Sequence, residues 1–184
     1  MPPSSNRRNL ELKVQCQPSD LDELLARTRE RSSGEIELLH QIDTYFDVPR
    51  GRLKLREIRV AKDVVVQAEL ISYARENEEG SRWSRYEVVP IAAEHAPALL
   101  RALLLTHRER VRIDKQRHVG LIGDTRVHLD RVEGLGTFVE LETVIENQPD
   151  GDAAKEHQQV IDALGLDRFP SIAGSYSDLA LDAG

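Results

Sequence analysis

Charged and apolar residues alternate with period two in about eight segments of the chain, and this pattern constrains the fold more than any other feature. In the first segment, one strand face holds Leu10, Leu12, Val14 and Cys16, and the other holds Asn9, Glu11, Lys13 and Gln15. The other segments lie around residues 41–45, 52–56, 64–75, 85–89, 111–119, 126–130 and 138–142. Most of them follow one another without the helix that a parallel connection requires. We therefore expect a largely antiparallel sheet.

Three further segments have the 3.6-residue period of amphipathic helices, at residues 19–31, 92–105 and 152–164. Gly165 follows the last of them, in the position where glycine commonly ends a helix. A length of 184 residues suits one domain with a substantial core. We expect a single domain over residues 8–182, after a disordered lead of residues 1–7.

Composition excludes several classes of protein. The net charge of −7 argues against a general nucleic-acid binder, which needs a positive excess to neutralise phosphates. No apolar run approaches the ~20 residues of a membrane span, so no membrane partner is expected. Cys16 is the single cysteine, which rules out an internal disulfide and a multi-cysteine zinc site and favours the reducing cytoplasm. The dipeptide Gly-Lys of a P-loop is absent.

The charged strand faces are clustered by sign. Basic clusters are Arg52/Lys54/Arg56 and Lys115/Arg117, and an acidic cluster is Glu140/Glu142. Like charges two apart on one face repel each other, unless a ligand of opposite charge lies between them. Taken singly, each face could equally form ordinary surface ion pairs in water. If the sheet instead closes with its apolar faces outward, the charges converge in a tunnel, where they must be paired or bind a ligand or metal.

We therefore predict an α+β fold: a closed antiparallel β-barrel of about eight strands, with helices packed outside. A tunnel that holds many Arg and Lys side chains and a separate patch of carboxylates suits a polyphosphate with a hard divalent cation. Arginine matches phosphate oxygens in two-point contacts. Mg²⁺ takes oxygen ligands and keeps several waters, so one or two carboxylates and the phosphate oxygens suffice.

Several stretches also carry a resemblance to a known family. They are Asn9 to Lys13, Gln41 to Asp47 followed by Gly51 to Glu57, Lys115 to Arg117, Val127 to Asp130 with Gly134 to Glu142, and Ser175 to Leu179. Their order and spacing resemble those of the CYTH family, or triphosphate tunnel metalloenzymes. That family includes class IV adenylate cyclases, thiamine triphosphatases and inorganic triphosphatases. The resemblance spans roughly residues 8–180 and implies the tunnel fold.

The resemblance also implies roles for individual residues. The implied ligands of Mg²⁺ or Mn²⁺ are Glu11, Glu140 and Glu142. The implied triphosphate-binding residues are Lys13, Lys54, Arg56, Arg75, Lys115 and Arg117, with Arg85 as a further inward-facing candidate. The implied catalytic residues are Lys13, Arg56 and Asp130, and Tyr176 would help to close the tunnel mouth.

One departure matters: Asn9 stands where the family has the first glutamate of a Glu-x-Glu-x-Lys strand. A neutral amide is a poorer Mg²⁺ ligand than a carboxylate. The expected substrate is a small-molecule triphosphate, namely ATP, tripolyphosphate or thiamine triphosphate. Cyclisation of ATP to cyclic AMP and hydrolysis both remain open, as does a non-catalytic module that binds polyphosphate or nucleotide. The sequence also leaves open whether the chain forms a homodimer.

Overall fold

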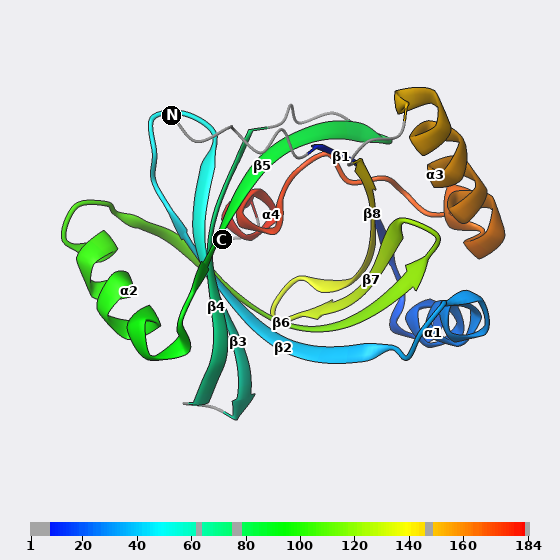
Figure 1. Cartoon of the computed structure of the whole chain (residues 1–184). Helices are drawn as coiled ribbons and strands as arrows, with labels where there is room; N and C mark the ends of the chain where they lie inside the picture. The colour runs from blue at the N-terminus through cyan, green and yellow to red at the C-terminus, as the bar shows by residue number, and fades with distance from the viewer. Residues whose placement is uncertain (1–7, 62–63, 75–78, 146–148, 183–184) are drawn as a thin grey trace.

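The computed structural model describes residues 8–61, 64–74, 79–145 and 149–182. In these residues, eight strands close in a ring in the order β1-β5-β4-β3-β2-β6-β7-β8 (Figure 1). Their bounds are β1 Arg8–Cys16, β2 Glu37–Phe46, β3 Arg52–Ala61, β4 Val64–Ala74, β5 Arg82–Ile91, β6 Glu109–Ile122, β7 Thr125–Val132 and β8 Gly136–Ile145. Every neighbouring pair is antiparallel. The predicted closed antiparallel sheet is confirmed.

Two helices cover the outside of the ring beside β1, β7 and β8: α1 (Pro18–Arg31) and α3 (Asp150–Leu164) (Figure 1). Leu24 of α1 and Leu164 of α3 pack with Leu12, Leu129 and Leu141 of the strands in one buried core. Each buried leucine contributes about 1.5–3 kcal/mol. The apolar strand faces therefore point outward beneath helices, and the charged faces are left for the interior.

The ends of the helices follow local signals. Asp20 accepts a hydrogen bond from the backbone of Gln17 at the start of α1, and Gly165 ends α3 with a positive φ of 67°. The predicted helix over residues 92–105 is instead a 3-10 turn, η1 (Ala93–His95), followed by α2 (Ala96–Leu104). Pro97 lies in the first turn of α2, where its missing N–H costs nothing.

One helix was not predicted. α4 (Tyr176–Asp182) has seven residues, too few for the period of a helix to stand out in the sequence. It lies within the outline of the ring in Figure 1, and Tyr176 packs with the inward-facing Tyr45, Ile113 and Phe138. The expectation that helices pack outside the ring is therefore confirmed for α1 and α3, and the unpredicted α4 is an additional helix on the inner side. No helix in the described part of the chain is long and apolar enough to cross a membrane.

Candidate functional site

The inward faces of the ring enclose a cavity of about 280 Å³. All eight strands and the start of α4 contribute to its lining, which comprises Asn9, Glu11, Lys13, Tyr45, Lys54, Arg56, Glu69, Ile71, Tyr73, Ser84, Tyr86, Val88, Lys115, Arg117, Arg126, His128, Glu140, Glu142, Ser175 and Tyr176. Strand register brings together residues far apart in the sequence, since Glu11 lies opposite Glu142 and Lys13 opposite Glu140 across β1 and β8.

Most of the predicted site residues line this cavity: Glu11, Lys13, Lys54, Arg56, Lys115, Arg117, Glu140 and Glu142. Arg85 does not, because Ser84 and Tyr86 on either side of it face inward and Arg85 is exposed on the outer face of β5. The expectation that Arg85 faces inward is wrong. Arg75 and the predicted lead of residues 1–7 lie outside the described residues.

One side of the cavity is a basic wall, formed by Lys54 and Arg56 of β3 and Lys115 and Arg117 of β6. Three of these cations converge on the fully buried Asp43 of β2. Asp43 Oδ2 accepts hydrogen bonds from Lys54 Nζ at 2.9 Å and Lys115 Nζ at 2.8 Å. Arg56 donates to both oxygens, from Nε at 2.8 Å and from Nη2 at 3.0 Å. The wall therefore has a counter-anion of its own.

Burial changes the ionisation of this wall. Desolvation lowers the pKa of Lys115 to about 7 and that of Lys54 to about 8, although Asp43 raises both. Burial opposes ionisation of Asp43 as well, but Arg56 and the two lysines outweigh it and hold its pKa well below the usual range. The lysines therefore change charge near neutral pH, and Asp43 stays ionised.

Arg117 is held from behind by Asp130 of β7. Its Nε donates to Asp130 Oδ1 at 2.7 Å and its Nη2 to Oδ2 at 2.5 Å. The Tyr176 hydroxyl donates to the same Oδ2 at 2.7 Å. Asp130 is fully buried and does not line the cavity. Asp130 thus lies behind Arg117 and holds its orientation, and its catalytic role stays a prediction.

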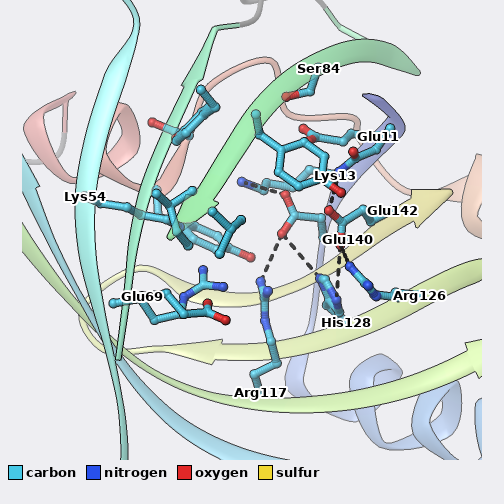
Figure 2. Close-up of a pocket in the computed structure, with 18 of the residues that line it drawn as sticks. Glu11, Lys13, Lys54, Glu69, Ser84, Arg117, Arg126, His128, Glu140 and Glu142 are labelled. Atoms are coloured by element: carbon cyan, nitrogen blue, oxygen red, sulfur yellow. Dashed lines mark hydrogen bonds and ion pairs between the residues drawn. The ribbon is translucent and has the colours of Figure 1, made fainter. Parts of the chain in front are cut away.

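The opposite side is an acidic wall, formed by Glu11 of β1 and by Glu140 and Glu142 of β8. Figure 2 shows Glu140 between Arg117, at 2.9 Å, and Lys13, at 3.6 Å. The His128 ring lies 3.8 Å from Glu140 Oε2 and 3.9 Å from Glu142 Oε2. Burial raises the pKa of Glu140, but Lys13, His128 and Arg117 outweigh this effect. The pKa of Glu140 therefore lies well below its usual range, and the side chain is ionised at neutral pH.

Asn9 completes the acidic wall. Its side-chain Nδ2 donates to Glu142 Oε1, and its Oδ1 is buried without a hydrogen-bond partner. A buried oxygen without a donor beside carboxylates suits a hard cation or one of its water ligands. No three His, Cys, Asp or Glu side chains in the described ranges already stand close enough to hold a metal. The donor set fits Mg²⁺ or Mn²⁺ completed by substrate oxygens and water.

Comparison with protein families assigns this chain to a family. The sequence model of the CYTH domain matches residues 7–176, which is nearly the whole chain. This chain belongs to the CYTH family. The match confirms the predicted family. Family members are triphosphate-processing enzymes.

Solved structures show that the fold of this CYTH domain is shared. A conserved hypothetical protein from Pyrococcus furiosus matches with a TM-score of 0.71 at 24% identity, over 93% of this chain and 99% of that one. A putative adenylate cyclase from Vibrio parahaemolyticus matches with a TM-score of 0.64 at 19% identity, over 94% of this chain and 97% of that one. A putative adenylyl cyclase from Hippeastrum matches with a TM-score of 0.60 at 16% identity, over 95% of this chain and 94% of that one. It is described as having a dominant triphosphatase activity. No curated protein matches the sequence.

The sequence did not point to three charged residues of this CYTH site: Asp43, Glu69 and Arg126. Asp43 shares a strand face with Gln41 and Tyr45. The basic clusters on β3 and β6, which pair with this strand, could have indicated that a buried anion faces them. Glu69 lies opposite Arg56 on β4 and lines the cavity. In residues 64–75 it is an isolated acid in a largely apolar segment, so no charge pattern marked it.

Proposed function

We propose that this CYTH domain is a divalent-metal-dependent enzyme that acts on the triphosphate of a small molecule, with hydrolysis as its leading reaction. The observation that carries the proposal is a single cavity in which the basic wall faces the acidic wall. Arg117 reaches across to Glu140 at 2.9 Å. A triphosphate on the basic wall would thus present its oxygens to the carboxylates on the other side.

The residues of the chain would act by positioning and electrostatics. Arg56 and Arg117 offer planar donors to phosphate oxygens, and Lys54 and Lys115 add point charges. Cations held in place before the reaction stabilise the charge that develops on the transferred phosphoryl group without reorganising. Bound on Glu11, Glu140 and Glu142, a divalent cation would supply Lewis-acid stabilisation of the same oxygens. Lys13 stands between the walls, 3.6 Å from Glu140 and over the ring of Tyr176.

Cyclisation of a nucleoside triphosphate is the second candidate, because part of the lining is uncharged. Ile71 pairs with Val88, and Tyr73 with Tyr86, across β4 and β5. Ile71 also lies directly opposite Lys54 on β3, so this patch borders the basic wall and offers a surface for a base. In that reaction the ribose 3′-hydroxyl attacks the α-phosphorus and pyrophosphate leaves.

The products separate these candidates. We would incubate the protein with tripolyphosphate, ATP or thiamine triphosphate, with Mg²⁺ or Mn²⁺, and measure phosphate, pyrophosphate and cyclic AMP. The proposal predicts metal-dependent release of phosphate, whereas pyrophosphate with cyclic AMP from ATP would identify a cyclase. Binding of these compounds without turnover would identify the non-catalytic module that the departure at Asn9 leaves open. As its location we propose the cytoplasm, where its one cysteine, the buried Cys16, would stay reduced.

A further inference from the structure

Asp43 occupies the centre of the basic wall, and strand register explains how. It lies directly opposite Arg56 on β3. Lys54 pairs with Tyr45, two residues along β2 in one direction, and Lys115 pairs with Gln41, two residues along in the other. Diagonal neighbours on one sheet face lie within reach of long side chains. Both lysines and the arginine therefore meet at one carboxylate.

The contacts are too many for an ordinary ion pair. Asp43 accepts four hydrogen bonds from three cations, at 2.8–3.0 Å. It has no exposed surface and does not line the cavity, whereas its three partners do. Asp43 thus stands behind the cations, on the side away from the space that a ligand would fill.

We propose that Asp43 is a positioning residue: a fixed internal anion that holds Lys54, Arg56 and Lys115 together and favours their charged forms, so that the cavity is arranged for a phosphate chain before one binds. Without it, three cations in a buried cluster would repel one another, and the lysines would relieve the repulsion by losing protons or turning away. With it, the four groups keep a net positive charge for an anionic ligand. This role rests on the proposed function only in that the ligand is a triphosphate.

The ionisation of Lys115 reports on this role. The charged or titratable groups that act on it are Asp43 of β2, Lys54 and Arg56 of β3, Arg117 of its own strand, Asp130 of β7 and Tyr176 of α4. Of these, Asp43 raises the pKa of Lys115, and the neighbouring cations lower it. Replacing Asp43 by a neutral residue should therefore lower the pH at which the lysine loses its charge.

The test compares wild type with Asp43→Asn, which keeps the shape of the side chain and removes its charge. The first readout is NMR titration of the lysine side-chain amines in ligand-free protein, and the second is calorimetric binding of tripolyphosphate in chelator between pH 5.5 and 9. We expect the titration of Lys115, and the midpoint above which binding weakens, to move down by about one pH unit or more. Tripolyphosphate ionises in the same way in both experiments, so its own titration does not contribute to the difference between the two midpoints.

Asp114→Asn is the matched control. Asp114 is on β6 beside Lys115, but it pairs with His40 and is partly exposed. It should leave both readouts unchanged. If Asp43→Asn does not fold, the double variant Asp43→Asn/Lys54→Met removes one cation with the anion, and it is compared with Lys54→Met alone under the same criterion.

An unchanged or raised midpoint, whether binding is weaker or not, would overturn the positioning role and leave Asp43 a purely structural residue. If wild type binds no tripolyphosphate at any pH, the proposed function fails, and the role toward triphosphate fails with it. The NMR titration keeps the two failures distinct, because it tests the effect of Asp43 on the lysines without any ligand.

Discussion

The two walls of the cavity differ in how their charges are compensated. The basic wall is built around two fully buried carboxylates, Asp43 and Asp130, which hold its cations from behind. The acidic wall contains Asn9 Oδ1, a buried oxygen with no hydrogen-bond partner. Glu140 pairs with Lys13 and Arg117, and Glu142 with Arg126, all of which line the cavity themselves. We infer that the basic wall is ready for its ligand, whereas the acidic wall is completed by a cation.

The largest expected effect comes from breaking the internal support of the basic wall. Asp130→Asn removes the bidentate partner of the buried Arg117 and leaves it only the single contact with Glu140; removing one member of a buried pair costs about 3–5 kcal/mol. Urea denaturation should show a loss of stability of that size. Asp22→Asn is the control, since Asp22 pairs with Arg131 on the surface and should change stability by less than about 1 kcal/mol. Equal stability of the two variants would refute the buried support.

The acidic wall should respond in the opposite way, in turnover rather than in stability. Glu142→Gln keeps the shape of the side chain and removes an anionic ligand, so we expect turnover with Mg²⁺ to fall about 100-fold or more, with stability changed by less than about 1 kcal/mol. Glu133→Gln, in the exposed hairpin before β8, is the control. Full activity of Glu142→Gln would remove Glu142 from the metal site.

A smaller effect should appear in the pH dependence of stability. Lys115 has a pKa of about 7 in the folded protein and an ordinary value near 10.4 when unfolded. Between these values the unfolded chain binds more protons, so stability rises with pH. From pH 7 to 9 we expect Lys115 to add about 2 kcal/mol to the free energy of unfolding of wild type, and Lys54, with a pKa of about 8, to add about 1 kcal/mol more. Lys115→Met should flatten this rise; an equal slope in both proteins would contradict the assigned ionisation.

The smallest effect should come from Asn9→Glu, which adds an anionic ligand to the acidic wall. Carboxylates bind Mg²⁺ better than a neutral amide does, so the metal concentration for half-maximal activity should fall a few-fold. Gln15→Glu adds the same charge on the same strand at an exposed position outside the cavity and should cause no shift. If Asn9→Glu needs more metal than wild type, Asn9 is not at the metal.

Much of this arrangement follows from period-two patterning, and the rest depends on distant pairing. Alternation predicts which side chains share a face, so inward positions such as Glu140 and Lys115 could be read from the sequence. It does not give strand order or register, and these are what bring Asp43 between β3 and β6. The error at Arg85 has the same origin: a shift of one residue moves a strand's side chains to the other face.

The most direct test of the account is metal-free binding of tripolyphosphate, measured by calorimetry in chelator, to wild type, Lys115→Met and Glu142→Gln. If the basic wall holds the triphosphate unaided, Lys115→Met should bind at least about tenfold more weakly near pH 6.5, where that lysine carries its charge. Glu142→Gln should bind within about threefold of wild type, because it removes only a ligand for the cation. The reverse order, or equal binding by all three proteins, would contradict the division of roles between the two walls.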